Sequence, residues 1–145
     1  MKRKLFCLFP FFIFLQFAFT SETTWIYDLH LSWAEVSRCN GIFVKTADDY
    51  WHKDWFFGRD SVNNCGIIQF SRSVKTCIPL ILPMNAKRKK GEAWSEAFGN
   101  DTLKIKISGQ PIRQMIQRRF SYDVAFELIS RRDTIREKLI GHCNY

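Results

Sequence analysis

The sequence predicts an all-β protein built from antiparallel strands. Residues 120–129 alternate apolar and polar side chains with a period of two, as a half-buried strand does. Residues 25–33 show a second alternation of the same kind, and turn-forming residues separate several further short apolar runs. No long segment has the 3.6-residue period of an amphipathic helix. These observations favour a two-sheet, antiparallel, immunoglobulin-like sandwich, with an interior that is either packed or open as an apolar cavity.

Residues 1–20 have the composition of a secretory signal peptide. Residues 2–4 are Lys-Arg-Lys, residues 5–19 are almost entirely apolar, and residues 18–20 fit a cleavage site flanked by small side chains. A signal anchor is the alternative, but the apolar run has 15 residues, whereas a membrane span needs roughly 20. We therefore expect a secreted, extracellular chain without a transmembrane segment, in which residues 21–145 form one domain.

The expected strands follow one another along the domain. Residues 42–44, 66–70 and 74–82 are short apolar runs, and residues 103–107 alternate apolar side chains with lysines. The polar residues 131–134 separate the strand at 120–129 from a looser apolar run at 135–140, which predicts a closing hairpin. The aromatic-rich residues 50–58 fit neither period, and residues 112–119 are compatible with a strand or a helical turn.

The net charge is positive. The full chain has 22 basic and 14 acidic residues, and removal of the leader with its three basic residues leaves 19 − 14 = +5. Such a charge suits anionic lipid head groups, glycosaminoglycans or nucleic acid without selecting among them. A solvated basic surface is the simplest interpretation.

Four cysteines remain after the leader: Cys39, Cys65, Cys77 and Cys143. An even number in an exported chain predicts two disulfides, for which three connectivities exist. A zinc site is disfavoured because no two cysteines have the C-x₂₋₄-C spacing. Asn100 begins the one Asn-x-Ser/Thr sequon, so we expect it on an exposed loop and glycosylated in a eukaryotic secretory pathway.

The second half of the chain resembles a known family. Lys90-Gly91-Glu92, the sequon that runs into Leu103-Lys-Ile-Lys-Ile107, and Tyr122-x-Val124-x-x-Glu127-Leu128 together are similar to the ML lipid-recognition domain. The nearest likeness is to the myeloid-differentiation accessory proteins of Toll-like receptors. The resemblance covers about residues 77–145 and implies a secreted sandwich that holds acyl chains of a lipid or glycolipid between its sheets, with a receptor ectodomain as a partner.

The resemblance also assigns roles to residues. It places seven side chains along the lipid pocket: Leu103, Ile105, Ile107, Tyr122, Val124, Phe126 and Leu128. Apolar residues of 25–33 would form the facing wall, and no charge should point inward, because an unpaired buried charge costs several kcal/mol. The basic run Lys87, Arg88, Lys89 and Lys90 is either a solvated loop or the rim that meets an anionic head group. Family usage and strand proximity lead us to expect disulfides joining Cys65 to Cys77 and Cys39 to Cys143.

Three classes of function remain open at this stage. A lipid-binding accessory protein is favoured, and a cationic defence protein that binds glycosaminoglycan or nucleic acid is the alternative, although nucleic acid is the weaker partner. A small secreted hydrolase would need His30, His52 or His142 to assemble with lysines, and no motif brings them together. We therefore expect no enzyme activity, no catalytic residues, no metal and no cofactor.

Overall fold

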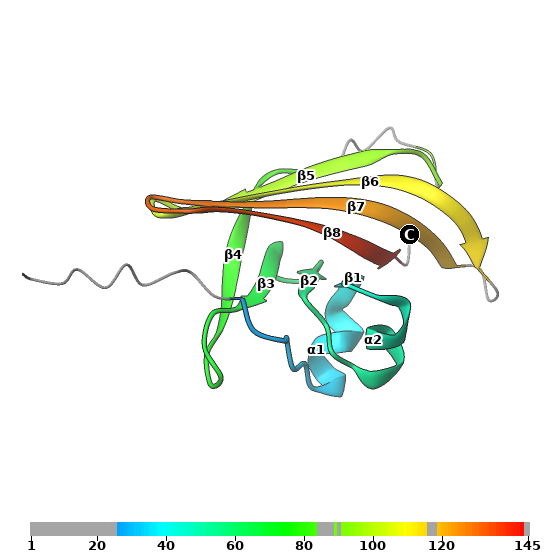
Figure 1. The fold of residues 1–145 in the computed structure, drawn as a ribbon, viewed down its shortest axis with the longest axis horizontal. Helices are drawn as coiled ribbons and strands as arrows, with labels where there is room; N and C mark the ends of the chain where they lie inside the picture. The colour runs from blue at the N-terminus through cyan, green and yellow to red at the C-terminus, as the bar shows by residue number, and fades with distance from the viewer. Residues whose placement is uncertain (1–25, 84–88, 90, 116–118, 144–145) are drawn as a thin grey trace, which may run out of the picture.

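The computed structural model describes residues 26–83, 89, 91–115 and 119–143, without the side chains of residues 113–115, 119–120 and 143. Eight antiparallel strands form a closed barrel in sequence order (Figure 1). Their bounds are β1 Cys39–Val44, β2 Phe57–Asp60, β3 Cys65–Gln69, β4 Lys75–Leu82, β5 Trp94–Gly99, β6 Leu103–Met115, β7 Arg119–Ser130 and β8 Thr134–Cys143. The predicted signal peptide lies outside the described residues.

The prediction of an all-β antiparallel fold is confirmed, but the strands close into one barrel instead of separating into two sheets. Closure occurs because β1 pairs with both β2 and β8, with Gly41 opposite Cys143 and Val44 opposite Ile140. The longest strands, β6 and β7, belong to a broad curved layer that spans β5–β8, and the shorter β1–β3 face it (Figure 1). Among the described residues, no helix is long and apolar enough to cross a membrane.

The segments with the clearest apolar patterns in the sequence form strands in the structure. The predicted closing hairpin is β7 and β8, which pair from Phe120 opposite Cys143 to Ile129 opposite Thr134. The lysine-alternating segment begins β6, which extends to Met115. Residues 66–70 and 74–82 correspond to β3 and β4.

Residues 26–33 are not a strand, contrary to the prediction. Their one ladder contact is an isolated bridge between Leu29 and Trp55. The segment ends where Ser32 caps helix α1, Trp33–Arg38, through a capping box with Glu35. A second short helix, α2, Ala47–His52, begins at a capping box between Thr46 and Asp49. Both helices lie outside the barrel beside its short strands (Figure 1).

Two apolar clusters lie on opposite faces of the short strands. The larger cluster fills the barrel interior, and its buried members come from β1–β8 and the residue before β2: Phe43, Phe56, Phe57, Ile68, Ile78, Trp94, Phe98, Ile105, Ile107, Tyr122, Val124, Phe126, Leu128 and Leu139. The smaller cluster lies on the outer face of β1–β3, where Leu29 and Trp55 pack against Val44 and Ile67. Leu29 and Leu31 therefore cover the short strands from outside, whereas Ile26 packs against the interior cluster.

Glycines that face the barrel interior leave room for aromatic side chains, because they have no side chain of their own. A Cβ on Gly109 would lie 2.5 Å from the Trp94 indole, and one on Gly66 would lie 2.4 Å from the Phe57 ring. The Phe43 ring lies similarly close to Gly41 and Gly141. Trp94, Phe57 and, at Gly141, Phe43 therefore pack directly on the backbone of a neighbouring strand, whereas Gly41 lies on the same strand as Phe43.

This packing predicts that Gly109→Ala destabilises the barrel. The new methyl group would overlap the indole of Trp94, and overpacking of this kind costs about 1–3 kcal/mol. Gly58→Ala is the matched control, because its nearest neighbour is a Leu31 side-chain atom at 3.4 Å. Urea denaturation of the two variants compares their free energies of unfolding. Equal stability of the two would contradict the packing described here.

Candidate ligand-binding site in the barrel interior

The seven side chains expected along a lipid pocket lie on one continuous inner surface. β6 and β7 pair with Ile105 opposite Leu128 and Ile107 opposite Phe126, so these side chains point the same way. Six of the seven are at most 2% exposed, and Leu103 is half-buried against the same cluster. Alternation in the sequence therefore identified the inward face of both strands correctly.

The facing wall differs from the prediction. It comes from the inward side chains of β1–β4, including Phe43, Phe57, Ile68 and Ile78. In the segment proposed for this role, Tyr27 is 39% exposed and Trp33 is 77% exposed, while Leu29 belongs to the outer cluster. Leu29 and Leu31 therefore face the outer surface of β1–β3 and not the interior.

Aromatic rings contact one another across the interior. The centroid of Phe57 lies 5.5 Å from that of Phe98 and 5.7 Å from that of Phe126. Trp94 lies 5.9 Å from both Phe43 and Tyr122. These distances are typical of packed aromatic pairs, so in this structure side chains occupy the space between the two walls.

A charged pair also lies inside the barrel, which the sequence analysis did not foresee. Arg59 on β2 and Glu96 on β5 alternate with inward aromatic residues, and their side chains are 8% and 2% exposed. The Arg59 Nε atom donates to Glu96 at 3.3 Å, and Nη1 donates to the backbone oxygen of Asp60 at 2.7 Å. The guanidinium carbon lies 6.0 Å from the centroid of the Phe98 ring. The expectation that no charge points inward is therefore wrong: Arg59 and Glu96 are both buried in the interior, where they pair with each other.

Trp94 places a further polar atom in the interior, next to Glu96 on the inward face of β5. It precedes Glu96 by two residues on β5, so both side chains point inward. The ring is 4% exposed, and its Nε1 atom is buried without a hydrogen-bond acceptor among the described residues. A buried donor without a partner costs about 1–3 kcal/mol, which makes this nitrogen a candidate point of contact for a ligand.

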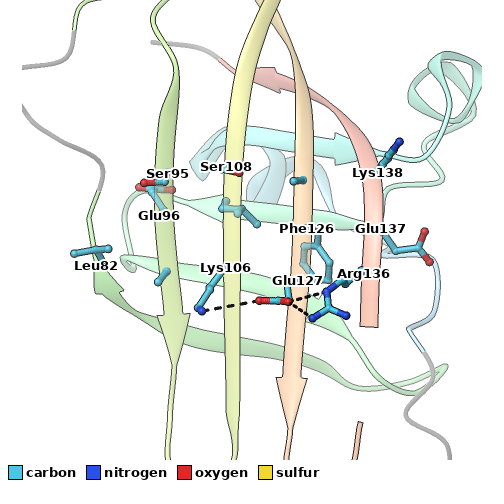
Figure 2. A pocket seen from close by; sticks show the side chains of 13 residues that line it. Leu82, Ser95, Glu96, Lys106, Ser108, Phe126, Glu127, Arg136, Glu137 and Lys138 are labelled. Carbon is cyan, nitrogen blue, oxygen red and sulfur yellow. Dashed lines mark hydrogen bonds and ion pairs between the residues drawn. The ribbon is translucent and has the colours of Figure 1, made fainter. Parts of the chain in front are cut away.

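A shallow groove of about 680 Å³ lies on the outer face of β5–β8 (Figure 2). Short side chains such as Ser95, Ser108 and Ala125 line it. On β6–β8 a ladder of alternating charge crosses the groove, with Glu127 3.9 Å from Lys106 and 2.8 Å from Arg136. Because acidic and basic groups alternate, this face is a poor surface for a polyanion.

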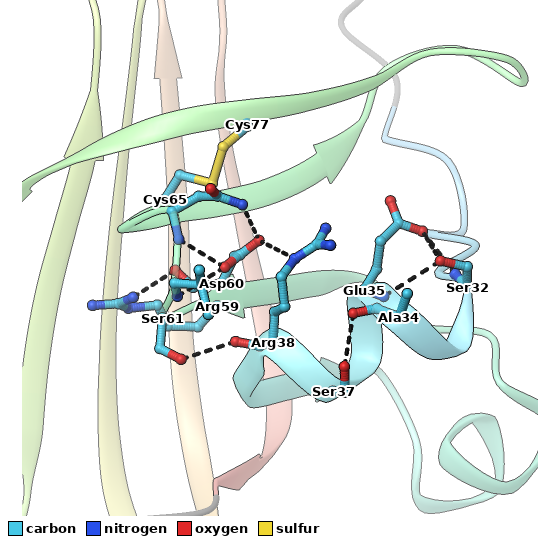
Figure 3. A network of polar contacts seen from close by, with 12 residues as sticks. Ser32, Ala34, Glu35, Ser37, Arg38, Arg59, Asp60, Ser61, Cys65 and Cys77 are labelled. Atoms are coloured by element: carbon cyan, nitrogen blue, oxygen red, sulfur yellow. Dashed lines mark hydrogen bonds and ion pairs between the residues drawn. A yellow bond between two sulfur atoms is a disulfide. The ribbon is translucent and has the colours of Figure 1, made fainter.

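A second cleft, of about 380 Å³, lies between α1 and the β3–β4 hairpin (Figure 3). Asp60 faces it and accepts hydrogen bonds from Arg38 at 3.3 Å and from the Asn63 amide at 2.8 Å. Burial alone would raise the pKa of Asp60, but the backbone and side-chain hydrogen bonds from Asn63, together with those from Arg38 and Val62, lower it. These bonds order the β2–β3 turn and give Asp60 a structural role.

The predicted disulfide between Cys65 and Cys77 is confirmed. It joins the neighbouring strands β3 and β4 with a Cα–Cα distance of 5.6 Å (Figure 3). The predicted bond between Cys39 and Cys143 is not formed, because Cys39 has a free buried thiol. The backbone of Cys143 lies opposite Gly41, and an irregularity of β1 separates Gly41 from Cys39. Burial raises the pKa of the Cys39 thiol to about 11, so this thiol is protonated at neutral pH.

The other predicted surface sites are only partly described. Lys87, Arg88 and Lys90 lie outside the described residues, while Lys89 is exposed and its backbone N–H donates to Glu92 at 2.9 Å. Asn100 is exposed on the loop between β5 and β6, and its side-chain oxygen accepts from the N–H groups of Thr102 and Leu103. Its glycosylation stays a prediction.

The histidines considered for catalysis belong to separate elements. His30 precedes α1, His52 ends α2, and His142 on β8 has its ring centroid 4.3 Å from that of Tyr50. Within the described part of the chain, no group of three or more His, Cys, Asp or Glu residues is arranged to hold a metal ion.

Comparison with known proteins returned no relative. No family model, no curated protein and no solved structure matches the chain.

The ion pair at the edge of the second cleft makes a pH-dependent contribution to stability. Lys75 lies 2.6 Å from Glu35, and its hydrogen bond lowers the pKa of Glu35 from 4.5 to about 2, with further help from the backbone of Ser32. The folded-state pKa lies below the unfolded one, so this stabilisation is present above about pH 4.5 and is lost as pH falls toward 2. Lys75→Met should therefore lower the melting temperature at pH 7, and its difference from wild type should shrink by pH 3.

Thermal melts across that range test the effect, with Lys104→Met on the exposed face of β6 as the control. A Lys75→Met difference that stays constant or grows toward pH 3 would rule out the proposed linkage to Glu35.

Proposed function

We propose that the protein is a secreted lipid-binding protein whose barrel interior takes up the apolar chain of a lipid-like ligand. The observation that carries the proposal is the continuous apolar interior, which all seven side chains assigned to the pocket help to line. An eight-stranded barrel is about wide enough either to be filled by side chains or to hold one small ligand. β1–β4 and β5–β8 supply the two walls that an acyl chain between sheets requires.

Because aromatic rings occupy the interior, an entering chain has to displace some of them. Each large apolar ring that loses its burial costs about 1.5–3 kcal/mol, whereas burial of a dozen methylene groups contributes roughly 10 kcal/mol at about 0.8 kcal/mol each. The ligand also loses translational and conformational freedom, which costs on the order of 4 kcal/mol or more, so binding is favourable when no more than about one ring leaves the interior. That ring would come from the cluster of Phe57, Phe98 and Phe126.

The role of an accessory subunit for an innate-immune receptor rests on the resemblance of residues 77–145 alone. Binding of a polyanion is the alternative function. The alternating ladder of Lys106, Glu127 and Arg136 disfavours it on the outer face of β6–β8.

Extraction of the purified protein with organic solvent, followed by lipid mass spectrometry, tests the proposal directly. A co-purified lipid in near-equal molar amount supports it. Absence of any lipid, together with salt-sensitive retention on heparin, would favour the polyanion-binding alternative.

A pair of neighbouring substitutions tests where a ligand binds. Ile107→Phe adds volume inside the barrel, whereas Ser108→Phe adds it to the exposed face of the same strand. We expect Ile107→Phe to weaken binding of the neutral probe Nile red at least tenfold and Ser108→Phe to leave it unchanged. Fluorescence titration measures the affinities, and thermal melts establish that both variants are folded. Equal effects of the two substitutions would place the probe outside the barrel and count against the proposal.

A further inference from the structure

The polar groups of the interior gather toward one end of the barrel. Arg59 lies near the end of β2, and Trp94 begins the antiparallel strand β5, with Glu96 two residues further on. The ring of Phe43 links these groups, since it lies 5.9 Å from Trp94 and close to Gly41, whose Cβ position is 3.4 Å from that of Arg59. Phe98, Ile105 and Leu128 lie toward the other end of β5, β6 and β7 and are apolar, and the Arg59 guanidinium carbon lies 6.0 Å from the Phe98 ring. Along β5–β7 the interior therefore passes from the polar atoms of Trp94 and Glu96 to an apolar end.

We propose that Trp94 Nε1 is the recognition point for an uncharged oxygen acceptor, a hydroxyl or carbonyl group, at the head of the ligand. This inference rests on the proposed function and specifies the chemistry of the ligand. The apolar chain then runs from Trp94 toward Phe98 and Leu128. The ligand oxygen supplies the acceptor that the buried indole N–H lacks within the described residues.

The charge balance around Trp94 selects an uncharged head group. The positive charge of Arg59 is already matched by the carboxylate of Glu96 at 3.3 Å, and both side chains are at least nine-tenths buried. A fatty-acid carboxylate would bring a second negative charge into this buried region without a free positive partner, which is strongly unfavourable. A hydroxyl or carbonyl oxygen accepts the indole N–H without disturbing the ion pair.

The backbone at this end leaves space that only rings occupy. Gly41, Gly109 and Gly141 place no side chain on the inner wall, and the rings of Phe43 and Trp94 lie over them. The indole nitrogen itself lies 2.5 Å from the Cβ position of Gly109. The rings of Phe43 and Tyr122 each lie 5.9 Å from the ring of Trp94, so a ligand oxygen that approaches Nε1 would have to displace one of them.

Three ligands with the same chain length test the proposal: dodecanol, dodecane and dodecanoate, each measured by displacement of Nile red. Trp94→Phe removes the N–H donor and keeps an aromatic ring. Trp55→Phe is the matched control, because Trp55 Nε1 is also buried without an acceptor among the described residues but belongs to the outer cluster. The informative quantity is the ratio of the dodecane to the dodecanol inhibition constant within each variant, which removes any effect on the probe itself.

We expect Trp94→Phe to lower this ratio about threefold to tenfold, the worth of one hydrogen bond, and Trp55→Phe to leave it at the wild-type value. Dodecanoate should respond to Trp94→Phe no more than dodecane does. A ratio unchanged by Trp94→Phe, or an equal loss for dodecanoate and dodecanol, overturns the inference while the proposed function stands. Failure of wild-type protein to bind Nile red or any of the three ligands overturns the proposed function and the inference with it.

A second measurement observes ligand binding to the wild-type protein. In ¹⁵N-labelled wild-type protein, dodecanol should shift the Trp94 indole N–H resonance downfield, and dodecane should not. The Trp94→Phe variant serves only to assign the signal. Identical shifts with the two ligands would contradict a hydrogen bond at Nε1.

Discussion

The interior of this barrel depends on aromatic rings that lie directly over inward glycines. Gly41, Gly66, Gly109 and Gly141 stand on four different strands, and a ring packs on each of them. A glycine within a strand costs roughly 0.5–1 kcal/mol, whereas burial of a large apolar side chain contributes about 1.5–3 kcal/mol. Ring burial is therefore the larger effect. The small barrel can hold five phenylalanines, a tryptophan and a tyrosine in its interior cluster because glycines beside Phe43, Phe57 and Trp94 on the same wall leave room for these rings.

The buried Arg59–Glu96 pair joins strands that are not neighbours in the barrel. β2 and β5 are separated by β3 and β4, so the ion pair spans the interior. Removal of charges from water costs several kcal/mol per ion, and well-packed apolar replacements for such pairs are often equally stable. Stability alone therefore does not account for this pair. Its position beside Trp94 gives the interior a polarity that an entirely apolar core would lack, and a ligand with distinct head and tail would be oriented by it.

The sequence predicted those strands whose two faces differ clearly in polarity. β7 and the start of β6 alternate apolar side chains with charged or small ones, so burial of one face determines their orientation. Trp94–Gly99 was not identified as a strand, because Glu96 occupies an inward position and interrupts the apolar pattern. Arg59 was missed for the same reason, since a buried ion pair becomes visible only when two distant strands are brought together. Residues 26–33 show the opposite error. They alternate, but among the described residues their backbone pairs with that of the barrel only through the Leu29–Trp55 bridge and one hydrogen bond from Tyr27 to Gln69, and these contacts do not make a strand.

The predicted sandwich and the observed barrel differ in the strand pairing at two seams, the places where the two walls of the barrel meet. β1–β4 and β5–β8 form two walls that meet where β1 pairs with β8 and where β4 pairs with β5. The β1–β8 seam has four residue pairs, whereas the β4–β5 seam has two, Leu80 with Phe98 and Leu82 with Ala97, separated by an irregularity. A sandwich would differ from this barrel mainly by loss of these few pairs. Local opening requires the least energy where the fewest backbone hydrogen bonds separate, so the β4–β5 seam is the part of the wall through which an apolar chain would most readily reach the interior.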